Sequence, residues 1–279
     1  MGLMARALRA IIGAAHAGPS FVVTLVTVLL AIVSGLEPWR VLVIGVIMAA
    51  NQLSIGWSND AIDAARDTDA ARTDKPVVRG DVRPRTIMSL AIGAAATALA
   101  LSLVLGPAFA LAHFVALGAG WAYNAGLKRT LLATACYAVA FALLPVLVAL
   151  AREEPRPAAW WAVVMGGMLG LAAHFANVLP DLEADRRHGI RALPHRLGAR
   201  GAGAVALAAL ATAGVLGVLG AAPATPLTLV GAGATVALLV AGLVVIMRAP
   251  GSRALFRIIM LAALAAVLTL AGAAGSIVA

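Results

Sequence analysis

Residues 40–67 read RVLVIGVIMAANQLSIGWSNDAIDAARD, an apolar stretch of membrane-spanning length that ends in a group of acids. The acidic part follows the pattern N-x-x-x-D-x-x-x-D through Asn59, Asp63 and Asp67. Residues four positions apart lie on the same side of an α-helix, with a drift of about 40° per step. The stretch therefore predicts a membrane helix whose last turns present one polar face.

A second copy of the pattern occurs later in the chain, at Asn177, Asp181 and Asp185. Of the 12 acidic residues, those outside these two segments are Glu37, Glu153 and Glu154. Amide and carboxylate oxygens are ligands for hard cations such as Mg²⁺. The two motifs therefore predict Mg²⁺ ligands at Asn59, Asp63, Asp67, Asn177, Asp181 and Asp185. For either motif taken alone, a solvated, charged helix end stays an open alternative.

The composition indicates that most of the chain lies in a bilayer. Hydrophobic residues make up 62% of it, and charged residues make up 12%, about half the usual share in soluble domains. Nine apolar stretches approach the roughly 20 residues that span hydrocarbon. They are residues 20–36, 40–58, 86–105, 108–124, 131–151, 158–180, 202–221, 226–247 and 255–276. We therefore expect an all-α, polytopic membrane protein with nine transmembrane helices in one domain, residues 1–279.

The distribution of basic residues predicts the orientation in the membrane. When alternate loops are assigned to opposite sides, the 21 Lys and Arg residues gather on one side, except for Arg40, Arg152 and Arg156. Loops rich in Lys and Arg stay in the cytoplasm, so we expect a cytoplasmic N-terminus, cytoplasmic motifs and a C-terminus on the opposite side. The net charge of +9 then reflects membrane topology, and we expect no nucleic-acid partner.

Basic residues accompany both acidic motifs. Lys75 and Arg79 follow the first motif, residues 186–196 contain several arginines after the second, and Lys128 and Arg129 follow the fourth stretch. Carboxylates can hold Mg²⁺, Mg²⁺ bridges phosphate oxygens, and Lys or Arg neutralises the remaining charge. The combination predicts a site for a metal-bound polyanion, although the bias of cytoplasmic loops towards positive charge accounts for some of these residues.

These motifs resemble those of the UbiA superfamily of intramembrane prenyltransferases. The matching blocks are Asn59-Asp60-x-x-Asp63-x-x-x-Asp67, Asp181-x-x-x-Asp185-x-x-x-Gly189, Lys75-Pro76 to Gly80, and Tyr123 to Thr130. The resemblance implies nine helices around a central cavity and Mg²⁺-dependent transfer of a prenyl group. The donor would be an isoprenyl diphosphate, and the acceptor an aromatic or other lipophilic molecule.

The resemblance also implies roles for individual residues. The catalytic aspartates would be Asp63, Asp67, Asp181 and Asp185, which with Asn59 would hold Mg²⁺ on the diphosphate. Asn177 joins this metal set through the internal repeat. The diphosphate would bind Lys75, Arg79, Lys128 and Arg129.

Three alternatives stay open at this point. A terpene synthase or cyclase of the same superfamily would act on a prenyl diphosphate alone, without an acceptor. A cation or phosphate transporter would account for a polar motif repeated in the two halves of a membrane protein, although both motifs are expected at one membrane face. A lipid-binding relative without activity would not need all of the motif aspartates.

Overall fold

The structure is a computed structural model that describes residues 9–15, 17–182, 185, 190, 192–221, 223–273 and 276–277. Its long helices are α2 (Ala17–Val33), α3 (Pro38–Asp69), α4 (Pro84–Ser102), α5 (Pro107–Ala125), α6 (Ala133–Leu150), α7 (Trp160–Val178), α9 (Leu193–Gly220), α10 (Pro226–Arg248) and α11 (Arg253–Gly272). Three short 3₁₀ helices join them: η1 (Leu103–Leu105), η2 (Leu127–Arg129) and η3 (Leu179–Asp181).

The helices occupy the nine predicted apolar stretches, which confirms the all-helical class for the described residues. Among the described residues, seven helices are long and apolar enough to cross a membrane, and Gly18–Val33 forms a shorter apolar helix. Helix α5 is not among the seven. The chain is thus an integral, multi-pass membrane protein, whereas nine crossings are not confirmed.

Proline and hydroxyl side chains mark where several helices begin. Helices α3, α4 and α10 carry proline in the first turn, where its missing N–H costs no intrahelical hydrogen bond. The Thr225 side chain accepts a hydrogen bond from the Thr228 N–H at the start of α10. Ser252 caps α11 in the same way through the Leu255 N–H. These residues set the helix boundaries locally.

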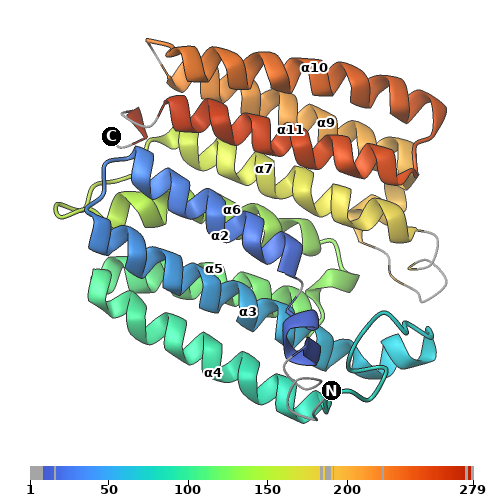
Figure 1. The fold of residues 1–279 in the computed structure, drawn as a ribbon. Coiled ribbons are helices and arrows are strands. Elements are labelled where there is room, and N and C mark those ends of the chain that lie inside the picture. Colours follow the sequence, from blue (N-terminus) through green and yellow to red (C-terminus); the bar gives the residue numbers. More distant parts are fainter. Residues whose placement is uncertain are drawn as a thin grey trace. The chain divides into compact units, whose positions relative to one another are not determined.

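Residue contacts divide the chain into two compact units. The first comprises Met1–Val28 and Glu37–Ala125, and the second comprises Leu29–Leu36 and Gly126–Ala279. Within the first unit, α3 packs against α4 and α5 (Figure 1). Buried polar side chains join these helices, since the His113 ring contacts Asn51 Oδ1 at 3.1 Å and Ser102 Oγ at 2.7 Å. Such hydrogen bonds between helices are a means of association inside a membrane.

The second unit contains α6, α7, α9, α10 and α11 (Figure 1). Glycine allows a close approach of α7 to α6. A Cβ atom at Gly166 would lie 2.6 Å from the Phe141 carbonyl oxygen, and one at Gly170 would collide with the Tyr137 carbonyl oxygen. Small residues spaced by four positions are typical of helix packing in membranes. The pair Gly166 and Gly170 therefore fixes the contact between α6 and α7.

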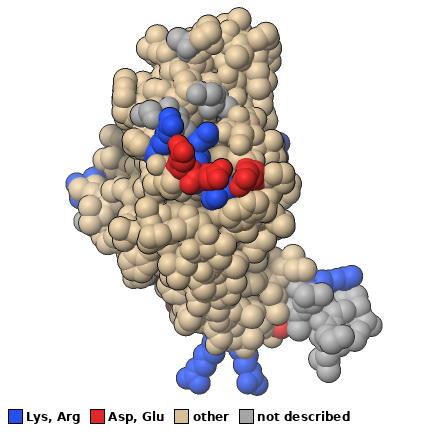
Figure 2. All heavy atoms as spheres, turned by 90° about the vertical axis from the view of Figure 1, so that its left-hand side faces the viewer, with Lys and Arg blue, Asp and Glu red and all other residues tan. Residues whose placement is uncertain are grey.

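Much of the surface is apolar. On the face in Figure 2 most atoms belong to uncharged residues, acids and bases gather in one mixed group, and further basic side chains project at the edges. Large apolar side chains point outward along the helices, among them Leu42, Leu111 and Met247. A soluble monomer rarely exposes so much contiguous apolar area. The helices are thus suited to contact with lipid.

Candidate functional site

The first motif lies in the last turns of the longest helix. Helix α3 has 32 residues and is therefore about 48 Å long at 1.5 Å per residue. The hydrocarbon core of a bilayer is about 30 Å thick. The helix remains continuous through Asn59, Asp63 and Asp67, as the sequence pattern predicts. These three residues therefore share one side of α3 beyond its apolar portion.

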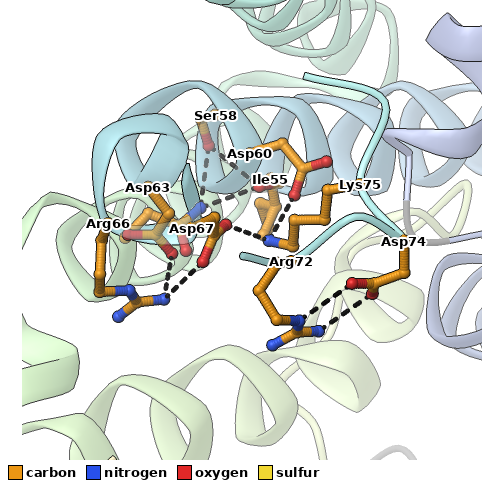
Figure 3. Close-up of polar contacts among 10 residues, drawn as sticks. Ile55, Ser58, Asp60, Asp63, Arg66, Asp67, Arg72, Asp74 and Lys75 are labelled. Atoms are coloured by element: carbon orange, nitrogen blue, oxygen red, sulfur yellow. Dashed lines mark hydrogen bonds and ion pairs between the residues drawn. The ribbon is translucent and has the colours of Figure 1, made fainter. Parts of the chain in front are cut away.

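The carboxylates of this segment are buried and paired with cations (Figure 3). The Arg66 guanidinium lies 2.9 Å from Asp63 and 3.6 Å from Asp67. The Lys75 ammonium lies 2.8 Å from Asp60 Oδ1 and 2.7 Å from Asp67 Oδ2. We call these five residues the first acidic cluster.

The first acidic cluster holds three carboxylates and two cations, so it keeps one negative charge in excess. Asp60, Asp63 and Asp67 are 2%, 2% and 3% exposed, and buried carboxylates require such partners. Burial alone would lower the pKa of Lys75, but its contacts with Asp60 and Asp67 outweigh burial and raise that pKa above its ordinary 10.5. Lys75 is therefore a fixed positive charge at neutral pH.

Arg79 organises the loop that carries Lys75. Its guanidinium donates hydrogen bonds to the carbonyl oxygens of Thr73 and Asp74, at 3.1 and 2.9 Å, and pairs with Asp81 at 2.7 Å. Gly80 adopts a positive φ of 75°, a conformation that glycine tolerates best. Arg79 is exposed and is engaged with the loop backbone, a role that its sequence position does not reveal. Its predicted contact with diphosphate stays a prediction.

The second motif differs from the first in its backbone. Asn177 lies in α7, whereas Asp181 lies in a 3₁₀ helix, so the second motif does not form one continuous α-helical face. Helix α7 ends at Val178 and gives way to the 3₁₀ helix η3. Pro180 lacks an N–H and crowds the carbonyl of the preceding turn, which explains the change. Asn177 and Asp181 are exposed, unlike the aspartates of the first motif.

Asp185 has a partner that sequence reasoning missed. Its Oδ2 lies 3.2 Å from Nε2 of His195, in the first turn of α9. The side chain of His195 is 3% exposed and that of Asp185 is 28% exposed. No recognisable spacing in the sequence links the two positions. Asp60 and Arg66, in contrast, were visible beside the first motif as additional charges on the same helix.

The remaining predicted residues lie near the start of the second unit. Lys128 and Arg129 belong to η2, where Lys128 is 8% exposed and Arg129 is exposed. A buried lysine carries a cost unless it has polar partners, so this position is unusual for a loop residue. In the predicted basic loop after the second motif, residues 186–189 and 191 lie outside the described residues.

The donor atoms of the first motif suit a hard cation. Among the described residues, no group of three or more His, Cys, Asp or Glu side chains is arranged as a metal site. The buried oxygen Asp67 Oδ2 lies 2.7 Å from the Lys75 ammonium. Carboxylate oxygens of this kind fit Mg²⁺. The two motifs belong to different units, and their predicted apposition across a central cavity stays a prediction.

The hollows described on the first unit are apolar and lie away from the aspartates. One of about 420 Å³ is lined by residues of α2 and α3 that include Val28, Leu42 and Val46. A second, of about 340 Å³, is lined by residues of α4 and α5 that include Phe114 and Trp121. Such grooves suit lipid chains and supply no charged group for chemistry.

Comparisons with known proteins relate the chain to one family. The model of the UbiA prenyltransferase family matches residues 20–255. A curated relative, the bacteriochlorophyll synthase 33 kDa chain of Cereibacter sphaeroides, is 29% identical over 184 residues. That match covers 61% of this chain and 59% of the relative, so the chain spans less than two thirds of the relative's length.

Solved structures share the fold. A digeranylgeranylglyceryl phosphate synthase has a TM-score of 0.74 at 11% identity, covering 96% of this chain and 99% of that one. A UbiA homologue from Aeropyrum pernix K1 has a TM-score of 0.70 at 18% identity, covering 95% and 96%. A UbiA homologue from Archaeoglobus fulgidus, bound to GPP and Mg²⁺, has a TM-score of 0.64 at 17% identity, covering 98% and 99%. On the extent of the family match, the chain belongs to the UbiA prenyltransferase family.

Proposed function

We propose that this protein transfers a prenyl group from an isoprenyl diphosphate to an aromatic or other lipophilic acceptor within the membrane, with Mg²⁺ as cofactor. The observation that carries the proposal is the first acidic cluster. It places the buried carboxylates of Asp63 and Asp67 beside two cations, at the end of a long apolar helix. A suitable ligand would have a bound metal ion for the carboxylates, a phosphate group for the two cations and a lipid tail for the apolar helix.

The metal-holding residues in this proposal are Asn59, Asp63 and Asp67 in the first unit and Asn177, Asp181 and Asp185 in the second. Bound Mg²⁺ neutralises diphosphate oxygens and so helps the allylic C–O bond to break. Lys75, Lys128 and Arg129 donate charge-assisted hydrogen bonds to the departing diphosphate. The apolar helices exclude water from the allylic cation until the acceptor attacks it.

The names of similar proteins support the choice of substrates. The Archaeoglobus homologue was solved with GPP and Mg²⁺ and also with DMAPP and Mg²⁺, which supports an isoprenyl diphosphate donor here. The curated relative is named for the synthesis of bacteriochlorophyll, a lipophilic pigment, and this supports a lipophilic acceptor. The predicted location of the reaction, at the cytoplasmic ends of the helices, agrees with a donor whose diphosphate lies in the headgroup region.

The function can be tested with purified protein in lipid nanodiscs. Labelled geranyl diphosphate is supplied with and without Mg²⁺, and with and without a panel of aromatic and lipophilic acceptors. We expect acceptor-linked label that depends on Mg²⁺. Labelled hydrocarbon formed without any acceptor would instead identify a terpene synthase. Ion or phosphate flux in liposomes without either product would identify a transporter.

Two matched variants sharpen the test. Asp63→Asn removes a buried carboxylate of the metal set and should lower turnover by about 100-fold or more, as the loss of a major electrostatic contribution does. Asp69→Asn removes an exposed carboxylate from the same helix and should stay within about twofold. Asp69→Asn should keep the melting temperature in detergent, whereas Asp63→Asn removes the buried partner of Arg66 and should lower it, so turnover is compared at a temperature at which both variants are folded. Wild-type turnover in Asp63→Asn would refute the metal assignment.

A further inference from the structure

Asp60 stands apart from the predicted metal ligands. It follows Asn59 directly, so it points about 100° away from Asn59 around the helix axis. It is nevertheless 2% exposed, and its Oδ1 accepts a hydrogen bond of 2.8 Å from the Lys75 ammonium. A carboxylate is buried so deeply only where a partner offsets the loss of water. The Lys75 ammonium is a partner of this kind for Asp60.

The loop that carries Lys75 is anchored independently of this ion pair. The Lys75 N–H donates to the Arg72 carbonyl at 3.0 Å, and the Lys75 carbonyl accepts from the Arg79 N–H at 3.1 Å. Two residues further on, Val77 is buried in a cluster with Ala14 and Ile87. The backbone at Lys75 is thus fixed on both sides, and the ion pairs decide only where its long side chain points.

We propose that Asp60 is a positioning residue, which holds the Lys75 ammonium beside Asp67 for contact with the diphosphate and does not itself bind the metal. The inference rests on the proposed function. A free lysine side chain loses considerable conformational entropy when it is fixed on a ligand. Asp60 fixes it in advance, and such preorganisation improves the binding of the ligand that follows.

The geometry also protects the negative charge of Asp67. The Lys75 ammonium lies between Asp60 at 2.8 Å and Asp67 at 2.7 Å, so neither carboxylate receives its whole charge. Asp67 also lies 3.6 Å from the Arg66 guanidinium, so without Asp60 the undivided charge of Lys75 would add to that of Arg66 at a carboxylate that the metal set needs. Asp60 therefore has two effects. It fixes the position of the Lys75 ammonium, and it leaves the Asp67 carboxylate able to bind a cation.

The test is a double-mutant cycle on Asp60→Asn and Lys75→Met, with the full chain in nanodiscs. We expect each single variant to raise KM for geranyl diphosphate about tenfold, the scale of one charge-assisted hydrogen bond, with the KM for the acceptor unchanged. The double variant should resemble either single variant, because both remove the same positioned ammonium. If the increase in KM for geranyl diphosphate in the double variant equalled the product of the two single increases, the proposal would be overturned.

Mn²⁺ affinity, measured by electron paramagnetic resonance, separates this inference from the proposed function. We expect Asp63→Asn to weaken Mn²⁺ binding and Asp60→Asn/Lys75→Met to leave it within about twofold of wild type. A loss in that double variant as large as in Asp63→Asn would make Asp60 a metal ligand and overturn the inference alone. Unchanged Mn²⁺ binding in Asp63→Asn would contradict the proposed function.

Two conservative variants guard against simple misfolding. Asp60→Glu keeps the carboxylate and should restore most of the diphosphate affinity that Asp60→Asn loses. Lys75→Arg keeps the charge and should fall between wild type and Lys75→Met. Melting temperatures in detergent accompany each measurement. If Asp60→Glu were as impaired as Asp60→Asn while equally well folded, a positioning role would be excluded.

Discussion

At the scale of single residues, the contact between Asp185 and His195 connects the second motif to α9 through polar side chains, and among the described residues it is the one such contact. The His195 ring is almost fully buried and lies 3.2 Å from the carboxylate, close enough to fix the orientation of Asp185. Groups that orient a metal-binding carboxylate change affinity or activity by about 10- to 100-fold when they are removed. Such a group affects metal affinity or activity only indirectly, through the carboxylate that it orients.

We accordingly predict that His195→Ala lowers prenyl transfer by about tenfold. His195→Gln, whose amide nitrogen can still reach the Asp185 carboxylate, should retain more of the activity. Turnover at saturating geranyl diphosphate and the melting temperature in detergent are the two measurements. Equal losses in the two variants, accompanied by a lower melting temperature, would show that His195 acts through packing alone.

The sequence predicted the first motif better than the second, for reasons that lie in particular residues. Asp63 and Asp67 fall on one helical face because nothing between them interrupts the helix. Pro180 interrupts the second motif, and its effect on Asp181 could not be read from spacing. The contact with His195 joins side chains ten positions apart in the chain. The charge of Arg79 is visible in the sequence, whereas its hydrogen bonds to loop carbonyls are not.

At the scale of the helices, the packing of α6 against α7 depends on glycines that face backbone atoms. Gly166 faces the Phe141 carbonyl oxygen, whereas Gly167 has ordinary space for a Cβ atom, with its nearest neighbour 3.7 Å away. A methyl group added at Gly166 would therefore clash with the backbone of α6, whereas one added at Gly167 would not. Overpacking of this kind usually costs about 1–3 kcal/mol.

We predict that Gly166→Ala destabilises the protein by about 1–3 kcal/mol, since α7 must move away from α6. Gly167→Ala adds the same methyl group one residue later and should be neutral or slightly stabilising, because alanine favours the helix over glycine. Unfolding in mixed micelles, followed by circular dichroism, would measure the difference. Equal stability of the two variants would contradict the close approach of the helices.

At the scale of the whole molecule, hydropathy predicted the helices because a bilayer leaves few other conformations for the backbone. A chain in hydrocarbon must satisfy its own hydrogen bonds, which single helices do. The relation between the two units does not follow from this rule, because it depends on how particular side chains pack. The number of membrane crossings does not follow from it either, since α5 is not among the candidate membrane helices and α2 is shorter than they are.

Topology can be tested by cysteine labelling, because Cys136 is the only cysteine in the chain. In a Cys136→Ala background, we predict that Asp74→Cys and Glu154→Cys react with a membrane-impermeant maleimide from opposite sides. Three helices, α4, α5 and α6, separate these exposed positions. Asp74→Cys should react from the cytoplasmic side, as the distribution of basic residues requires. Labelling of both positions from one side would reject the predicted orientation.

The unbroken length of α3 makes the protein sensitive to the lipid around it. From Pro38 to Asp69 the helix has no break, so the height of its aspartates above the apolar segment is fixed by the helical rise. Membranes differ by several ångströms in hydrocarbon thickness, and helices respond by tilting. A thicker bilayer would draw the aspartates towards the acyl chains, and a thinner one would lift them into water. If the proposed function holds, the acyl-chain length of the surrounding lipid should affect how well the aspartates of α3 meet the diphosphate of a substrate in the bilayer.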